Sequence, residues 1–247
     1  MKRRMGLFLA LSMIAAMLTA PAATQAASSV YAPAATKQQI MDMADKYSDS
    51  QSSTFMIQDG NLYRWGSGVA TPTKVDFGEE KVKIIRVSHV GSLALTESGK
   101  VYGWGGNYDF VVCPYGANNG YDAGGQYTEP QLYPQSAFGD EKVVDIRIAR
   151  YAGAAKTESG KWYVWGTKPY VSIFAPTSTA TTRYPFAIAD TFSDEMLGGR
   201  EIADIQFTGH ISTTMVLTTD GELFICGSYS GRGDEIVSGK KTIIAPT

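Results

Sequence analysis

The sequence contains few of the residues from which most catalytic and metal sites are built. Its 247 residues include two histidines, His89 and His210, and two cysteines, Cys113 and Cys226. Neither histidine lies in a recognisable nucleophile–base or paired-carboxylate motif, so turn or packing roles are favoured over catalysis. Two cysteines and two scattered histidines are too few for a metal cluster. The sequence therefore predicts no catalytic residue, no metal and no cofactor.

Long apolar runs are also scarce. The one extended apolar run is Met5–Leu18, and the three residues before Met5, positions 2–4, are basic. A basic start, an apolar stretch of this length and small residues at Thr24–Ala26 are typical of a secretory signal peptide. We expect residues 1–26 to be removed and the rest to be secreted to the extracellular space or cell envelope, without membrane association. An uncleaved anchor is the alternative.

Clustered positive charge is absent from the rest of the chain. The three basic residues 2–4 leave with the signal peptide, so 19 of the 22 basic side chains remain against 24 acidic ones. The net charge of the mature chain is then about −5 with histidine neutral. Because a nucleic-acid partner needs a clustered Lys/Arg surface, we expect no nucleic-acid binding.

What the sequence does contain is one short stretch that occurs four times. Each copy has a polar residue and a glycine, then an apolar and aromatic run that ends at glycine: Asp59–Gly66, Ser98–Gly105, Ser159–Gly166 and Asp220–Gly227. The polar-Gly pair supplies the positive φ of a two-residue turn. The run after it is rich in residues that favour strands. Each copy therefore predicts a β-hairpin and its second strand.

Other strand patterns flank these hairpins. Strands such as Lys81–Val87 and Ser92–Thr96 recur before the later turns, and a Pro-containing stretch such as Thr71–Val75 follows each closing glycine. Proline suits an edge strand or a strand start. Four short antiparallel strands per repeat are typical of a propeller blade, so the sequence predicts an all-β, β-propeller-like array of about four four-stranded antiparallel blades.

The Val-x-x-Ile, Ala-Leu-Thr and Gly-x-Val-Tyr-x-Trp-Gly patterns resemble the repeat of the regulator of chromosome condensation family, in a bacterial secreted form, over roughly residues 54–247. The family's histidine position is occupied here by Gly91, Gly153 and Thr213. The resemblance implies a seven-bladed ring in a complete member, so this chain would be an incomplete arc. The acidic mature chain argues against transferring the chromatin and GTPase-exchange roles of nuclear members.

Residues 27–52 are expected to form a linker and a short helix before a repeat domain over 53–247. Thr36 and Gln39 have the spacing of a capping box. A helix over Thr36–Tyr47 would carry an apolar face, and we expect it to cover a blade edge; partner docking is the alternative. The first strand of the first unit is missing or degenerate within Tyr47–Ser53. The residues of the apolar face are Ile40, Met43, Ala44 and Tyr47.

Length varies mainly after the tryptophan strand, in the insertions Gly106–Thr128 and Thr167–Arg183. Long loops in compact domains are usually functional or disordered, and tyrosine provides apolar area with a hydroxyl group. The aromatic residues of these loops are therefore candidates for partner binding; the alternative is that the rings fold back and cap the blade ends. The candidates are Tyr108, Phe110, Tyr115, Tyr121, Tyr127, Tyr170 and Phe174.

The two cysteines have a separate interpretation. Cys226 stands where the other repeats have Trp65, Trp104 and Trp165, which predicts a small buried core residue. In an exported chain Cys113 and Cys226 can pair if their Cα atoms lie within the limit for a disulfide.

These observations favour a secreted, non-catalytic interaction module whose loops bind an unknown protein or glycan partner. A secreted hydrolase on the same blades, a propeller-type enzyme inhibitor and a structural envelope component are the alternatives.

The chain ends leave closure of the array open, with three units and two partial ends. The terminal segments could complete one blade between them, or open blade edges could join two chains in a homo-oligomer, or the chain could be a remnant of a longer protein. We expect an open arc.

Overall fold

The structure is a computed structural model that describes residues 36–50, 53–66, 68–107, 111–113, 125–166, 174, 182–188, 197–207, 213–227 and 242–244. The chain divides into two compact units, residues 1–37 and 38–247. All strands of the described residues lie in the second unit. No helix in the described part of the chain has the length and apolarity needed to cross a bilayer.

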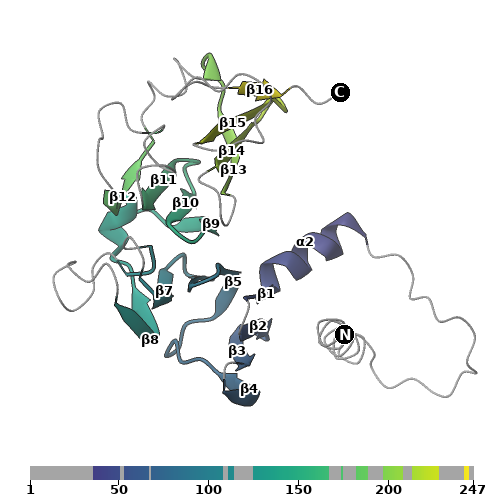
Figure 1. The fold of residues 1–247 in the computed structure, drawn as a ribbon, viewed down its shortest axis with the longest axis vertical. Coiled ribbons are helices and arrows are strands. Elements are labelled where there is room, and N and C mark those ends of the chain that lie inside the picture. Colours follow the sequence, from purple (N-terminus) through teal and green to yellow (C-terminus); the bar gives the residue numbers. More distant parts are fainter. Residues whose placement is uncertain are drawn as a thin grey trace, which may run out of the picture. The chain divides into compact units, whose positions relative to one another are not determined.

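Four four-stranded antiparallel sheets follow one another along the described chain, which confirms the predicted fold class (Figure 1). The first sheet contains β1 (Tyr47–Asp49), β2 (Ser53–Gln58), β3 (Asn61–Gly66) and β4 (Val69–Lys74). The second contains β5 (Val82–Val87), β6 (Gly91–Thr96), β7 (Val101–Gly106) and β8 (Gln126–Leu132). The third contains β9 (Val143–Ile148), β10 (Ala152–Thr157), β11 (Trp162–Gly166) and β12 (Thr182–Ala187). The fourth contains β13 (Ile202–Phe207), β14 (Thr213–Thr218), β15 (Leu223–Gly227) and β16 (Thr242–Ile244).

Both terminal sheets have four strands of their own. The degenerate first strand expected near Tyr47 is β1, which pairs with β2, and β16 pairs with β15. The alternative in which the two chain ends complete one blade between them is therefore wrong, as is the count of three units with two partial ends. The repeat also begins before residue 53, because β1 already belongs to the first sheet.

The short helix α2 (Lys37–Lys46) precedes β1. Its expected apolar face is not buried: Ile40 and Met43 are 58% and 42% exposed, and Tyr47 belongs to β1 rather than the helix. Instead the last turn of the helix lies against β5, where Arg86 donates to the carbonyl oxygen of Ala44 at 3.0 Å. A cation at a helix C-terminus is favourable because the last carbonyl groups carry partial negative charge.

The predicted two-residue turn occurs in the first sheet alone among the four hairpins. Asp59 and Gly60 both have positive φ, 52° and 76°, as a tight turn between β2 and β3 requires. In the other sheets the turn is two residues longer, from 97 to 100 in the second. The hydroxyl of Thr96 accepts from the backbone N–H of Lys100 at 3.0 Å, and Thr218 does the same in the fourth sheet. Gln58 occupies this position in the first sheet, so its turn stays short.

The hydrophobic core lies between consecutive sheets. Trp104 and Trp165 from the third strands of the second and third sheets are 3% and 0% exposed, and each packs on the sheet before its own. A connector phenylalanine reinforces each contact: Phe77 lies edge-on to Tyr102 at 5.1 Å, and Phe138, at the end of the 3-10 helix η2 (Gln135–Phe138), lies edge-on to Tyr163 at 5.8 Å. These contacts hold successive blades face to face.

Candidate interaction site

The predicted binding residues fall in two groups. Tyr108, Phe110, Tyr115, Tyr121 and Tyr170 lie outside the described residues, as does His210. The other two are placed. Tyr127 lies in β8, half-buried beside Trp104 and Cys113, and Phe174 is 1% exposed in the core between the third and fourth sheets. Phe174 therefore takes the packing role that was the alternative to binding.

The insertion after β7 is closed at its base by Asn107. The backbone N–H of Asn107 donates to the carbonyl oxygen of Gly125 at 2.8 Å, just before β8 begins. The Asn107 side chain is 1% exposed. Its Nδ2 donates to the Cys113 carbonyl at 3.0 Å, while its Oδ1 accepts from the backbone N–H groups of Val112 and Cys113. One buried amide thus fixes residues 111–113 against the start of the loop.

Val111 ties the same loop to the third sheet. Its carbonyl oxygen accepts two hydrogen bonds, from the Tyr133 hydroxyl at 2.5 Å and from Trp165 Nε1 at 2.9 Å. Both donors are buried aromatic side chains in the core between the second and third sheets. A buried polar group without a partner costs free energy, so breaking these two hydrogen bonds would be unfavourable. The two donors and their shared acceptor therefore fix the loop on the blades. We name the set Asn107, Val111, Tyr133 and Trp165 the loop clamp.

A glycine makes room for the loop clamp. The third strands have Arg64 and Val164 at the position that Gly103 occupies in β7. A Cβ built on Gly103 would overlap the carbonyl oxygen of Val112, which lies directly on this part of the strand. The missing side chain at 103 is the sequence signal for a loop packed on the blade, and sequence reasoning overlooked it.

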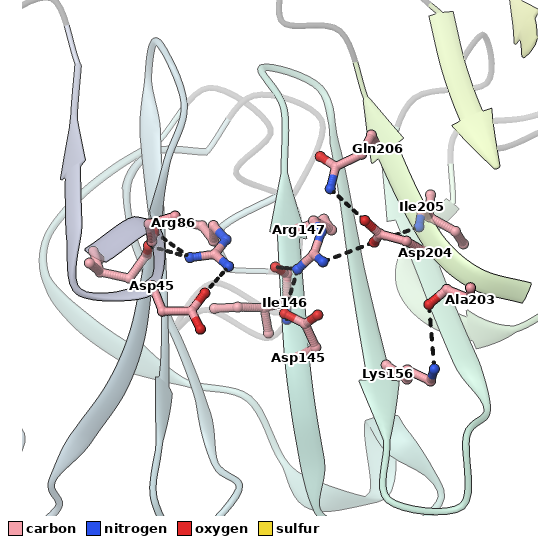
Figure 2. Close-up of polar contacts among 12 residues, drawn as sticks. Asp45, Arg86, Asp145, Ile146, Arg147, Lys156, Ala203, Asp204, Ile205 and Gln206 are labelled. Atoms are coloured by element: carbon pink, nitrogen blue, oxygen red, sulfur yellow. Dashed lines mark hydrogen bonds and ion pairs between the residues drawn. The ribbon is translucent and has the colours of Figure 1, made fainter. Parts of the chain in front are cut away.

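A second polar feature runs along the first strands of the sheets (Figure 2). Arg147 of β9 pairs with Asp145 on its own strand and, at 2.9 Å, with Asp204 of β13. Arg86 of β5 pairs at 2.5 Å with Asp45 of α2. Figure 2 shows both guanidinium groups directed at these carboxylates. We name these five residues the inner-strand ladder.

The inner-strand ladder satisfies backbone groups as well as charges. The backbone N–H of Ile146 donates to Asp145 and that of Ile205 to Asp204, both at 2.8 Å. Arg147 donates to the carbonyl oxygen of Ile146 at 2.8 Å. First strands are sheet edges, and edge groups left unpaired invite strand addition.

The charges of the ladder also stabilise one another. Burial opposes the charged form of Arg147, but Asp145 and Asp204 outweigh it and raise the pKa of the guanidinium above its usual value. We interpret the ladder as edge protection and not as a ligand site.

Among the described residues, the reactive side chains of His89 and Cys113 lie on different segments. His89 is exposed on the turn between β5 and β6. Cys113 is buried in the loop clamp region, and the side chain of Cys226 lies outside the described residues, so their pairing stays a prediction. Among the residues that the structure describes, no group of three or more His, Cys, Asp or Glu side chains is placed to hold a metal ion.

Solved structures with the same arrangement of blades include human WBSCR16 and Prp20p from Saccharomyces cerevisiae. The first superposes on 81% of this chain with a TM-score of 0.62 and 17% identity; the second covers 81% with a TM-score of 0.57 and 18% identity. Prp20 is the yeast RCC1, so the fold of this chain is RCC1-like. The RCC1-like match covers 51% and 50% of those two chains, so this chain spans about half their length.

Sequence comparison agrees with the RCC1-like fold. The RCC1 domain-containing protein RUG3 of Arabidopsis thaliana, a mitochondrial protein, is 26% identical over 192 residues, which cover 70% of this chain and 39% of the relative. A bifunctional serine/threonine-protein kinase/NEDD4-like E3 ubiquitin-protein ligase of Dictyostelium discoideum is 35% identical over 96 residues, 5% of its length. No family model matches the sequence.

Proposed function

We propose that this chain is an exported, non-catalytic interaction module that binds a protein partner through the insertion between Asn107 and Gly125. The loop clamp is the observation that carries the proposal. Asn107 donates two hydrogen bonds and accepts two, and the Val111 carbonyl oxygen accepts two more; together they hold the base of the insertion on the core of two adjacent blades. A loop without a role needs no such attachment, whereas a recognition loop gains affinity from a fixed base because less freedom is lost on binding.

The composition of the insertion supports a protein partner. Between the clamped residues it carries Tyr108, Phe110, Tyr115 and Tyr121 among asparagine and glycine. Tyrosine with small polar residues is the composition of antibody paratopes, where rigid rings supply contact area and the polar residues adapt. The proposal also agrees with Prp20p, a protein of this fold whose binding properties to Gsp1p and histones are described.

A site-specific photocrosslinking experiment tests the proposal. A photoreactive phenylalanine analogue is placed at Tyr115 or Tyr121 in the exported chain, and crosslinked products from the surrounding medium are identified by mass spectrometry. We expect one protein to be crosslinked from both positions. The matched control places the analogue at Glu97, which is exposed on the hairpin turn at the other end of β7.

Two variants separate the loop from its base. Replacing residues 114–124 by a short Gly-Ser turn should abolish binding of the identified partner and leave the unfolding temperature unchanged. Asn107→Ala should weaken binding and lower stability by about 1–3 kcal/mol, because buried backbone groups lose their partner. Equal crosslinking from Glu97, or full binding by the shortened chain, would show that the insertion is not the site. Crosslinks to carbohydrate alone would favour a glycan partner instead.

A further inference from the structure

Each sheet has two faces, and the strand registers identify them. We call the face that packs on the preceding sheet the backward face and the one that packs on the following sheet the forward face. In the second sheet Tyr102 and Trp104 lie on the backward face, paired across the hairpin with Ala94 and Ser92. Leu93, Leu95 and Val101 lie on its forward face and pack against Tyr163 and Trp165 of the third sheet.

The backward face of the first sheet carries the same residue types. Tyr63 pairs with Met56 and Trp65 with Thr54, in the register of Tyr102 with Ala94 and Trp104 with Ser92. Yet Trp65 is only half-buried, whereas its equivalents Trp104 and Trp165 are buried. In the described part of the chain, no core cluster includes Met56, Tyr63 or Trp65.

The forward face of the fourth sheet carries leucine, isoleucine and methionine in place of an aromatic pair. Leu217 pairs with Leu223 and Met215 with Ile225, in the register of Leu95 with Val101 in the second sheet. Leu217 is 39% exposed, whereas Leu95 is 0% exposed under the third sheet. Met215, Leu223 and Ile225 are half-buried, and none of the four belongs to a core cluster of the described residues.

These two faces at the ends of the array therefore complement each other. Between the first and second sheets, Trp104 of a backward face is covered by Phe55 and Leu62 of a forward face, and between the second and third sheets Trp165 is covered by Leu93 and Leu95. A second copy of this chain is a partner certain to carry both faces. Apolar side chains that stay partly exposed on one face can form an association surface.

We propose that two copies of the chain associate head to tail, with the forward face of the fourth sheet of each on the backward face of the first sheet of the other. The two contacts are equivalent, so a two-fold axis closes the pair. Two copies would supply eight blades, within the range that propellers adopt, and the solved RCC1-like structures are about twice as long as the matched part of this chain. This association uses neither the loop clamp nor the proposed partner.

Sedimentation velocity and light scattering on the exported chain test this proposal without a partner. We expect a dimer that dissociates on dilution. Trp65→Glu, on the backward face, and Leu217→Glu, on the forward face, should each give a monomer, because each substitution places a charge in both contacts of the pair. Val144→Glu is the matched control: Val144 is 38% exposed on the third sheet, and the variant should remain a dimer.

Mixing the two monomeric variants identifies the head-to-tail geometry. A mixed pair has one contact with both substitutions and one contact with neither, so Trp65→Glu and Leu217→Glu together should recover a heterodimer weaker than the wild-type pair. This recovery also shows that both variants fold, since a misfolded chain could not complement the other. A wild-type monomer at all concentrations would overturn the proposal. So would loss of the dimer in only one of the two variants, failure of the mixture to associate, or a monomeric Val144→Glu chain.

Discussion

The junction between the second and third sheets and the junction between the third and fourth sheets use equivalent strands but different side chains. The first is filled by Trp165 and the connector Phe138, whose rings lie 6.1 Å apart. At the junction between the third and fourth sheets, Cys226 and Leu197 stand at the equivalent positions in the sequence. There the buried space is occupied by Trp162 of β11 and by Phe174 of the insertion that follows it.

The difference shows that a blade contact needs a given volume and not a given residue. Ala154 on the forward face of the third sheet is smaller than Leu93 at the equivalent position of the second, and the rings of Trp162 and Phe174 fill this junction. Interiors are packed to crystal-like density, so a loss at one position must be filled from another. At this junction an insertion completes the core, whereas the insertion of the second sheet is held by hydrogen bonds to the core.

The largest effect is expected at Trp165. Trp165→Ala should lower the free energy of unfolding by about 3–5 kcal/mol, because it opens a cavity between two sheets and removes the N–H donor to Val111. Trp165→Phe, which keeps most of the ring volume, should cost less and report mainly the lost hydrogen bond. Urea unfolding measures both. If the two variants were equally stable, ring volume would not be what holds this junction.

A smaller effect is expected at Phe174 because the junction it fills is less aromatic. Phe174→Ala should cost about 3 kcal/mol, and Phe174→Leu should recover most of that loss, since a leucine refills the space without a polar atom. Neither variant should change binding of a partner to the 107–125 loop. Wild-type stability of Phe174→Ala would mean that the residue does not complete the core.

The strands were predictable from the sequence because their determinants are local and repeated. The polar-Gly turn and the closing glycine recur in each unit, and the Tyr-x-Trp pattern recurs in the first three; they coincide with β3, β7, β11 and β15. A second repeat was overlooked. Phe77-Gly78 and Phe138-Gly139 each precede an acidic pair, a lysine and a valine, and the structure shows why: the phenylalanine packs on the aromatic pair of the next blade.

What could not be predicted depends on contacts between distant segments. Phe174 belongs to a loop whose composition gives no sign that one ring enters the core. The turn lengths depend on whether a threonine hydroxyl accepts from the backbone four residues on, and β1 is too short to give a periodic signal. Gly103 was the sequence signal for the loop clamp, because the asparagine and valine that form the clamp look like ordinary loop residues.

The smallest expected effect concerns a contact before the first strand of a sheet. In the fourth sheet the charge at this position is the reverse of that in the second and third sheets. Two residues before the first strand, the second and third sheets have Glu80 and Glu141, and each accepts a hydrogen bond from a turn serine, Ser98 or Ser159. The fourth sheet has the reverse: Arg200 precedes the strand and pairs at 2.8 Å with Asp220 in the turn. The same contact is thus made once with Arg and Asp and twice with Glu and Ser.

These contacts lower the pKa of the carboxyl groups. Thr218, and then Arg200, hold the pKa of Asp220 below its usual value, and Lys100 and Ser98 do the same for Glu80. A carboxyl group with a lowered pKa stabilises the folded state above its unfolded pKa, and that contribution disappears as the pH falls through the folded value. The effect is small because the groups are exposed and solvent screens them.

Exchanging the two residues tests whether the pair is a unit. Arg200→Glu alone should lower the unfolding temperature by on the order of 1–2 °C at neutral pH, because Glu and Asp then face each other. Adding Asp220→Ser should restore it, since the fourth sheet would then carry the Glu–Ser contact of the second. The difference in unfolding temperature between the wild-type chain and Arg200→Glu should shrink below about pH 4, because a carboxyl group becomes protonated there and the wild-type ion pair is also lost. Thermal unfolding of the four chains of the double-mutant cycle, at neutral and acidic pH, measures the coupling. Additive effects, or a deficit that grows on acidification, would show that Arg200 and Asp220 act independently.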